Sequence, residues 1–140
     1  MRNCLIIALL LTAAPAFAAD EGAMEYREHT MEAVGGHMQA IVDIIRRKVP
    51  HTSHLAMHVN AIDDIAKIVD TLFPAGSEGG DALPAIWKDP ADFAEKIQTF
   101  QMASAALREA AASGDMAIIG PGLGRMGESC KGCHDNYRAE

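Results

Sequence analysis

Two cysteines and a histidine stand within five residues near the end of the chain, in the segment Cys130-Lys131-Gly132-Cys133-His134. Cysteines three positions apart on a helix lie about one turn from each other, so both thiols can add to the two vinyl groups on one edge of a porphyrin. The imidazole of His134 can then turn to the iron. The motif C-x-x-C-H therefore predicts one haem c, covalently bound through Cys130 and Cys133, with His134 as an iron ligand.

The same two cysteines allow other interpretations. An exported protein would favour a disulfide between them. A redox-active C-x-x-C pair of the thioredoxin type would stand near a βαβ pattern, and a zinc site would need a second pair of ligands. The sequence contains neither a βαβ pattern nor a second pair of zinc ligands, so haem attachment is the favoured interpretation.

The N-terminal segment has the pattern of a secretory signal peptide. Arg2 precedes a short apolar run from Cys4 to Leu11, and Ala16-Phe17-Ala18 forms a small-residue cleavage site. A retained membrane anchor would need about 20 apolar residues, and this run is shorter. We therefore expect residues 1–18 to be removed, Cys4 with them, leaving a periplasmic domain over residues 19–140 without a membrane span.

Composition and charge limit the classes of function. The chain has 140 residues, enough for one domain, with 49% hydrophobic and 5% aromatic residues and a formal net charge of −7. This acidic balance argues against nucleic-acid binding and predicts redox partners with basic docking patches. The sequence has no acid–base pair or nucleophile with a partner, so an enzyme is not expected.

Four amphipathic segments predict an all-α protein. They span about 21–48, 53–73, 89–113 and 116–137, with apolar residues repeating at gaps of three and four. Pro50 ends the first segment, Ser53 is a candidate N-cap for the second, and Asp89-Pro90 starts the third. The Gly- and Pro-rich stretch 74–84 predicts a loop, followed by a short turn over 85–88. Three short connections and one longer one favour an antiparallel up-down four-helix bundle with covalently bound haem.

The last segment carries one local conflict. Its apolar positions include both cysteines, which places the haem against the inside of the bundle: Met116, Ile119, Leu123, Met126, Cys130, Cys133 and Tyr137. Glycines surround Pro121 near its start and weaken a helix there. We expect either a kink at this point or a helix that becomes regular only near Pro121.

A haem motif at the end of a four-helix bundle resembles the class II c-type cytochromes, the cytochrome c′ family. The resemblance covers nearly the whole mature chain. The segments that carry it are Tyr26-Arg27-Glu28-His29-Thr30-Met31, Gly35-Gly36-His37-Met38-Gln39-Ala40-Ile41, Pro84 through Phe93, and Gly127 through Arg138.

The resemblance implies roles for further residues. Arg27 matches an arginine that lies near a haem propionate in the family, and Arg138 matches a basic residue beside the proximal face. Trp87 matches an aromatic residue near the haem edge. The plain alternatives are solvated helix faces for the two arginines and ordinary loop packing for Trp87.

The sixth coordination position of the iron decides the function. In the family, the side chain four residues after the Arg27 position faces the distal side of the iron, and here that residue is Met31. A low-spin branch of the family, similar to cytochrome c-556, uses a methionine thioether as sixth ligand. Met/His ligation raises the reduction potential and suits electron transfer. The alternatives are Met31 as a core side chain, Met38 as the thioether ligand, or a second imidazole from His29 or His37, both of which we expect to point outward.

These residues predict a periplasmic monohaem cytochrome that carries single electrons, with iron held by His134 and Met31. The main alternative is a five-coordinate cytochrome c′ that binds NO or CO, with Met31 as a non-coordinating distal residue. A third is a haem-free bundle closed by a disulfide. A homodimer through the first two helices would fit the family.

One more group of side chains could bind a metal. His54 and His58 are four residues apart, with His51 nearby. No acidic or thiol partner accompanies them, so a solvated or partly packed helix face is expected.

Overall fold

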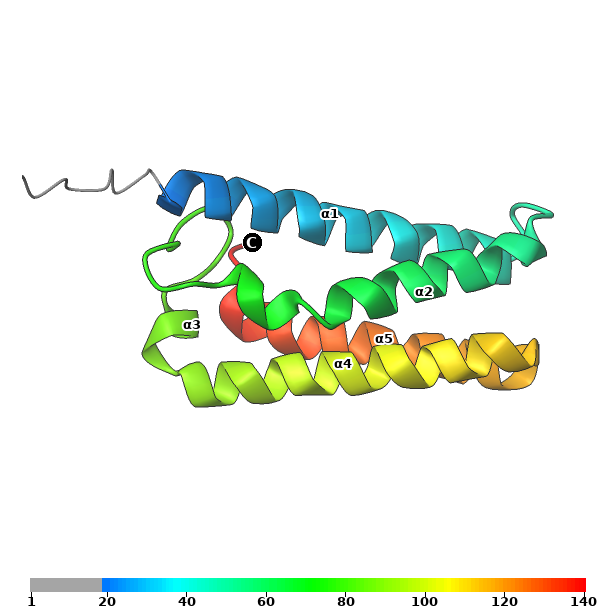
Figure 1. The fold of residues 1–140 in the computed structure, drawn as a ribbon. Helices are drawn as coiled ribbons and strands as arrows, with labels where there is room; N and C mark the ends of the chain where they lie inside the picture. The colour runs from blue at the N-terminus through cyan, green and yellow to red at the C-terminus, as the bar shows by residue number, and fades with distance from the viewer. Residues whose placement is uncertain (1–18) are drawn as a thin grey trace, which may run out of the picture.

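A computed structural model describes residues 19–140; the predicted signal peptide, residues 1–18, lies outside the described residues. The predicted antiparallel up-down four-helix bundle is confirmed (Figure 1). Its long helices are α1 (Ala19–Ile45), α2 (Leu55–Ala66), α4 (Pro90–Ser113) and α5 (Met116–Tyr137). Shorter elements are the 3-10 turns η1 (Thr52–His54) and η2 (Val69–Leu72) and the one-turn helix α3 (Ala85–Lys88).

The bundle is closed on three sides and open on the fourth. Helix α1 packs on α2, α2 on α4, and α4 on α5, whereas within residues 19–140 α1 and α5 make no comparable contact. The core contains aliphatic and aromatic side chains from all four long helices, among them Ile41, Ile62, Phe93, Leu107, Ile119 and Met126. Of the neighbouring pairs of long helices, α1 and α5 therefore contact each other least.

Both ends of α4 follow from its capping residues. Asp89 Oδ1 accepts a hydrogen bond from the Asp92 amide at 3.3 Å, and Pro90 occupies the first helical position, as the sequence predicts. Helix α4 ends at Ser113, and Gly114 caps it. The φ of Gly114 is 70°, the left-handed conformation that glycine adopts without a Cβ clash.

Helix α5 begins earlier than one sequence alternative predicts. Asp115 caps it through the Ala117 amide at 2.8 Å, and the helix continues through Pro121, so a regular start only at Pro121 is wrong. Gly122 has a packing reason: a Cβ there would lie 3.2 Å from Leu107 Cδ1 on α4. The glycine lets the two helices approach closely. Met116, expected in the core, is exposed at the end of the bundle.

The second predicted helix is shorter than expected. The Ser53 N-cap is wrong, because residues 52–54 form a 3-10 turn and α2 starts at Leu55 without a side-chain cap. At the other end, the helix is followed by η2. The Ile68 amide donates a hydrogen bond to the Ile65 carbonyl, three residues back, as in a 3-10 turn. Pro74 follows closely, and the residue before a proline disfavours the α conformation, so the chain leaves the helix before it.

One buried carboxylate ties α2 to α4. Asp63 accepts hydrogen bonds from Ser104 Oγ at 3.2 Å and Arg108 Nη1 at 2.8 Å, and Lys67 Nζ lies 3.0 Å away. Burial by itself would raise the pKa of Asp63, but the hydrogen bonds from Arg108, Lys67 and Ser104 outweigh it and hold the pKa below its usual value. The ionised form of Asp63 therefore stabilises the bundle.

We predict that Asp63→Asn lowers the free energy of unfolding by about 1–3 kcal/mol at pH 7, because Ser104 and Arg108 lose a charged acceptor. A folded-state pKa below the unfolded value of about 3.9 means that this stability is present above that pH and is lost as the pH falls through the folded pKa. Denaturant unfolding at pH 7 and at pH 3 measures both effects.

The matched control is Asp64→Asn, one position along at an exposed site, which should change stability by less than about 0.5 kcal/mol. An equal loss for the two variants at pH 7, or a wild-type advantage over Asp63→Asn that persists undiminished in acid, would contradict the assignment.

Candidate functional site

A buried arginine organises the end of the bundle where the long loop lies. Only 3% of Arg27 is exposed. Its Nη1 donates to the Ser77 carbonyl at 3.0 Å and to Ser77 Oγ at 3.1 Å, and its Nη2 donates to the Gly79 carbonyl at 3.0 Å. A solvated helix face for Arg27 is therefore wrong. Its guanidinium holds the 74–84 loop against α1, and proximity to a haem propionate stays a prediction.

Aromatic rings surround the same guanidinium. Arg27 Cζ lies 5.2 Å from the centre of the Phe73 ring and 5.8 Å from that of Trp87, within the range of cation–π attraction. Trp87 Nε1 donates to the Pro74 carbonyl at 3.1 Å. Burial lowers the pKa of Arg27, an effect that Glu28 opposes. The structure thus brings together Arg27 and Trp87, two residues that the family resemblance singled out separately.

The end of the chain is tied to the same loop. The Leu83 amide donates to the Tyr137 carbonyl at 2.9 Å, and the Ala139 amide donates to the Asp81 carbonyl at 2.8 Å. Arg138 Nη2 lies 3.1 Å from Asp81 Oδ2, with both side chains exposed. Figure 1 shows the C-terminus beside the loop, at the end of the bundle where α1 starts. Arg138 therefore has a loop partner that sequence reasoning did not anticipate.

Tyr137 is a further residue that sequence analysis placed only in the core. Its hydroxyl donates to Asp92 Oδ2 at 2.5 Å, and its ring packs edge-on against Phe93 at 5.0 Å between centres. The hydrogen bond to Asp92 and burial together raise the pKa of Tyr137 to about 12. The contact fixes the last turn of α5 on the first turn of α4. Since the partner lies 45 residues away, no local pattern could have revealed it.

The predicted haem-binding residues lie on the final turns of α5. Cys130 and Cys133 are half-buried, carry free thiols and pack against the hydrophobic core, whereas His134 is exposed. Burial raises the pKa of Cys130, and burial together with the neighbouring Cys130 raises that of Cys133 to about 11. Although His134 is exposed as a whole, partial desolvation of its imidazole, followed by the charge of Arg138, lowers its pKa, which favours the neutral imidazole that can bind a metal.

The opposing wall comes from α1. Arg27, Met31, Val34 and Met38 follow one another at helical spacing, and Met31 and Met38 are half-buried against the core. Helix α1 thus carries two thioethers, an aliphatic side chain and a guanidinium on this face. Helix α5 carries two thiols and an imidazole, and the two helices make little direct contact. This donor set and the incomplete fourth side of the bundle fit a flat, largely apolar macrocycle attached to α5.

The structure corrects the sequence view of the histidines. His29 is exposed, as expected, but His37 does not face solvent: it is half-buried, and its Nδ1 lies 2.9 Å from Nδ1 of His58. His54 instead stacks on His51 at 4.9 Å between ring centres. His54 is exposed and His58 is half-buried, which agrees with the solvated or partly packed helix face expected for them.

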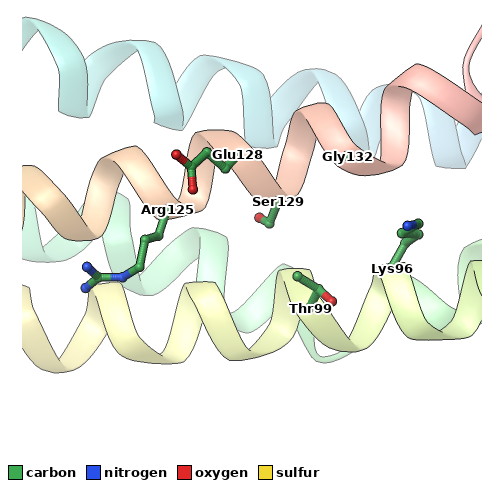
Figure 2. A pocket seen from close by; sticks show the side chains of 6 residues that line it. All are labelled: Lys96, Thr99, Arg125, Glu128, Ser129 and Gly132. Atoms are coloured by element: carbon green, nitrogen blue, oxygen red, sulfur yellow. The ribbon is translucent and has the colours of Figure 1, made fainter.

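A polar groove runs between α4 and α5 close to the haem-binding segment. Figure 2 shows Lys96 and Thr99 from α4 and Arg125 and Ser129 from α5 along it. The Ser129 hydroxyl donates to its own helix, at the Met126 carbonyl. None of the predicted iron or thioether ligands lines this groove, although Gly132, between Cys130 and Cys133, does.

Comparisons with known proteins match the family resemblance. A family model described as Cytochrome C′ matches residues 22–138. Cytochrome c′ of Alcaligenes xylosoxydans xylosoxydans is 33% identical over 87% of this chain and 97% of its own length. Cytochrome c-556 of Agrobacterium tumefaciens (strain II Chrys) is 34% identical over 84% of this chain and 97% of its own.

Solved structures share the fold. A nitric oxide complex of a mutant cytochrome c prime from Alcaligenes xylosoxidans superposes with a TM-score of 0.82 and is 33% identical. The match covers 89% of this chain and 99% of that one. Along the part of the chain that the structure describes, no helix is both long and apolar enough to cross a membrane.

We predict that Arg27→Lys lowers the free energy of unfolding by about 1–3 kcal/mol, because one ammonium cannot serve Ser77 and Gly79 together. Backbone amides of the 74–84 loop should exchange hydrogen faster, which mass spectrometry measures. Arg125→Lys, at an exposed position on α5, is the control and should leave both quantities unchanged. Normal loop protection in Arg27→Lys would show that the guanidinium does not hold the loop.

Proposed function

Because this chain belongs to the cytochrome c′ family, we propose that it carries single electrons, with its iron held by His134 and Met31. Its cofactor is one haem c, joined to the protein through Cys130 and Cys133. The haem supplies one-electron chemistry when bound: the protein accepts one electron from a donor and passes one to an acceptor. The protein supplies attachment, axial ligands and surroundings.

The proximal side rests on α5. Cys130 and Cys133 project from its core-facing side, and a thioether at each would hold the macrocycle along the helix. His134 follows directly, on an exposed position where the lowered pKa favours a neutral imidazole. Arg138, one turn further, keeps a positive charge beside it while bonded to Asp81.

The observation that carries the proposal is the placement of Met31. It lies one turn after buried Arg27 and one turn before buried Val34, half-buried on the α1 face that looks into the bundle. No close packing with α5 covers that face. In the proposed arrangement, the Met31 thioether would bind the iron on the side opposite His134. A soft sulfur ligand favours ferrous iron and raises the potential, which suits electron transfer.

A gas-binding cytochrome c′ is the second candidate. The support for it is the high structural similarity to a cytochrome c prime that binds nitric oxide. In that case Met31 would pack over the distal side of the iron without coordinating it. Identity does not separate the candidates, because the cytochrome c′ and cytochrome c-556 relatives are 33% and 34% identical.

The proposed compartment is the periplasm. It rests on the signal-peptide pattern in residues 1–18. The mature chain would hold 11 basic and 19 acidic side chains, a formal charge of −8. A homodimer through α1 and α2 is also part of the proposal.

The decisive experiment is Met31→Leu. The wild-type holoprotein should show low-spin optical spectra in both oxidation states and no change with CO. In Met31→Leu the iron loses its sixth ligand, so the spectra should become high-spin and shift on CO addition, and the reduction potential should fall. Spectroscopy and potentiometry on the two holoproteins measure these effects.

Met38→Leu is the matched control, since Met38 is also half-buried on α1 and lies almost two turns further along. Its spectra should equal those of the wild type. A high-spin wild type that binds CO would refute ligation by Met31 and favour the gas-binding candidate. A loss of low-spin character in Met38→Leu alone would move the ligand to Met38.

The acidic surface predicts a salt-dependent reaction rate. Electron transfer with a cationic reagent such as hexaammineruthenium should slow as ionic strength rises, because salt screens the attraction. The rate with anionic ferricyanide should increase under the same conditions. Stopped-flow kinetics over a salt series measures both, and rates that ignore ionic strength would contradict electrostatic steering.

A further inference from the structure

Two histidines from different helices meet inside the bundle wall. His37 on α1 and His58 on α2 are both half-buried, and their Nδ1 atoms lie 2.9 Å apart. The ring centres are 5.2 Å apart, with planes tilted by 55°. Neither ring is explained by haem binding, because His37 stands six residues, or about 9 Å of helix, beyond Met31. The two Nδ1 atoms lie within hydrogen-bond distance of each other between the helices.

The distance between these nitrogens has a chemical meaning. Imidazole nitrogens bind first-row divalent metals at about 2.0–2.1 Å. Two such bonds from nitrogens 2.9 Å apart enclose an angle of about 90°, the angle between neighbouring ligands in square-planar or tetragonal coordination. A tetrahedral Zn²⁺ site would hold them about 3.4 Å apart. The pair therefore matches the geometry of Cu²⁺ or Ni²⁺ better than that of Zn²⁺.

We propose that His37 and His58 form a two-imidazole site that binds a tetragonal divalent transition metal, Cu²⁺ above all, and clamps α1 to α2. Among first-row divalent ions, Cu²⁺ binds nitrogen donors most strongly. Within residues 19–140, no set of three or more His, Cys, Asp or Glu side chains is arranged as a metal site. Water therefore occupies the remaining coordination positions, and an external ligand can replace it at one or two of them.

The protonation of the pair permits this binding. In the metal-free pair, one Nδ1 carries the shared proton and the other accepts it. Binding requires the donor ring to carry its proton on Nε2 instead, which is a change of tautomer without net proton loss. Burial, followed by the nearby His37 and His54, lowers the pKa of His58, so the neutral form prevails near pH 7.

The test is calorimetric titration of the haem-loaded protein with Cu²⁺ at pH 7.5, with Zn²⁺ as the second probe. We expect one Cu²⁺ ion at this site, with an affinity reduced at least about tenfold in His37→Gln and in His58→Gln. Electron paramagnetic resonance of the bound Cu²⁺ should show a tetragonal centre with two imidazole nitrogens. Both variants should lose that signal. Zn²⁺ should bind more weakly than Cu²⁺.

His51→Gln and His54→Gln are matched controls from the neighbouring stacked pair, and each should bind Cu²⁺ as the wild type does. Loss of binding in His54→Gln with retention in His37→Gln would assign the metal to the i, i+4 pair formed by His54 of η1 and His58 of α2, and would overturn the proposal. Equal Cu²⁺ affinity in all five proteins would also overturn it.

A second measurement separates metal binding from folding defects. Cu²⁺ should raise the melting temperature of the wild type and of His54→Gln, but not that of His37→Gln. An unchanged haem spectrum and helical circular dichroism show that His37→Gln is folded. If that variant does not fold, the wild-type resonance spectrum decides, since a centre without two imidazole nitrogens refutes the site.

Discussion

The burial of one guanidinium is the constraint from which the organisation of the loop end follows. A charged group removed from water must have hydrogen-bond acceptors, and Arg27 finds them in Ser77 and Gly79 of a loop about 50 residues away. The loop consequently closes over the start of α1 instead of extending into solvent. Phe73 and Trp87 cover the guanidinium, and the C-terminal residues pair with the other side of the loop. One arginine thereby positions the aromatic residues and the end of α5 that surround the candidate haem site.

The second organising feature is the unequal packing of the four helices. Contacts link α1 to α2, α2 to α4 and α4 to α5, and the side between α1 and α5 has no comparable contacts among the described residues. Small residues achieve the closest approach elsewhere, as Gly122 does against Leu107. Helices α1 and α5 carry the candidate ligands, which are two thiols and an imidazole on α5 and the thioethers of Met31 and Met38 on α1. If the haem binds between them, as proposed, its binding and the stability of the bundle would be coupled.

Polar side-chain pairs between helices specify which helices pack against each other. Asp63 with Ser104 and Arg108 fixes α2 on α4, Tyr137 with Asp92 fixes α5 on α4, and His37 with His58 fixes α1 on α2. Each is a buried or half-buried contact in which loss of one partner leaves the other unsatisfied. Together they define which helix faces which, where hydrophobic packing alone tolerates sliding and rotation.

The sequence by itself determined the helical class, the four long segments, the start of α4 at Asp89-Pro90 and the C-x-x-C-H motif, because periodicity, capping and a five-residue motif are local. It did not predict the short α2, which is preceded by the 3-10 turn η1 and followed by the 3-10 turn η2. Nor did it reveal the partners of Arg27, Tyr137 and His37. Those partners lie 21 to 52 residues away, and only the packing of helices and loop decided which side chains share a buried space. Short-range sequence patterns therefore specify the helices. Which distant polar side chains form hydrogen bonds with one another depends on which of them are buried together in the folded protein.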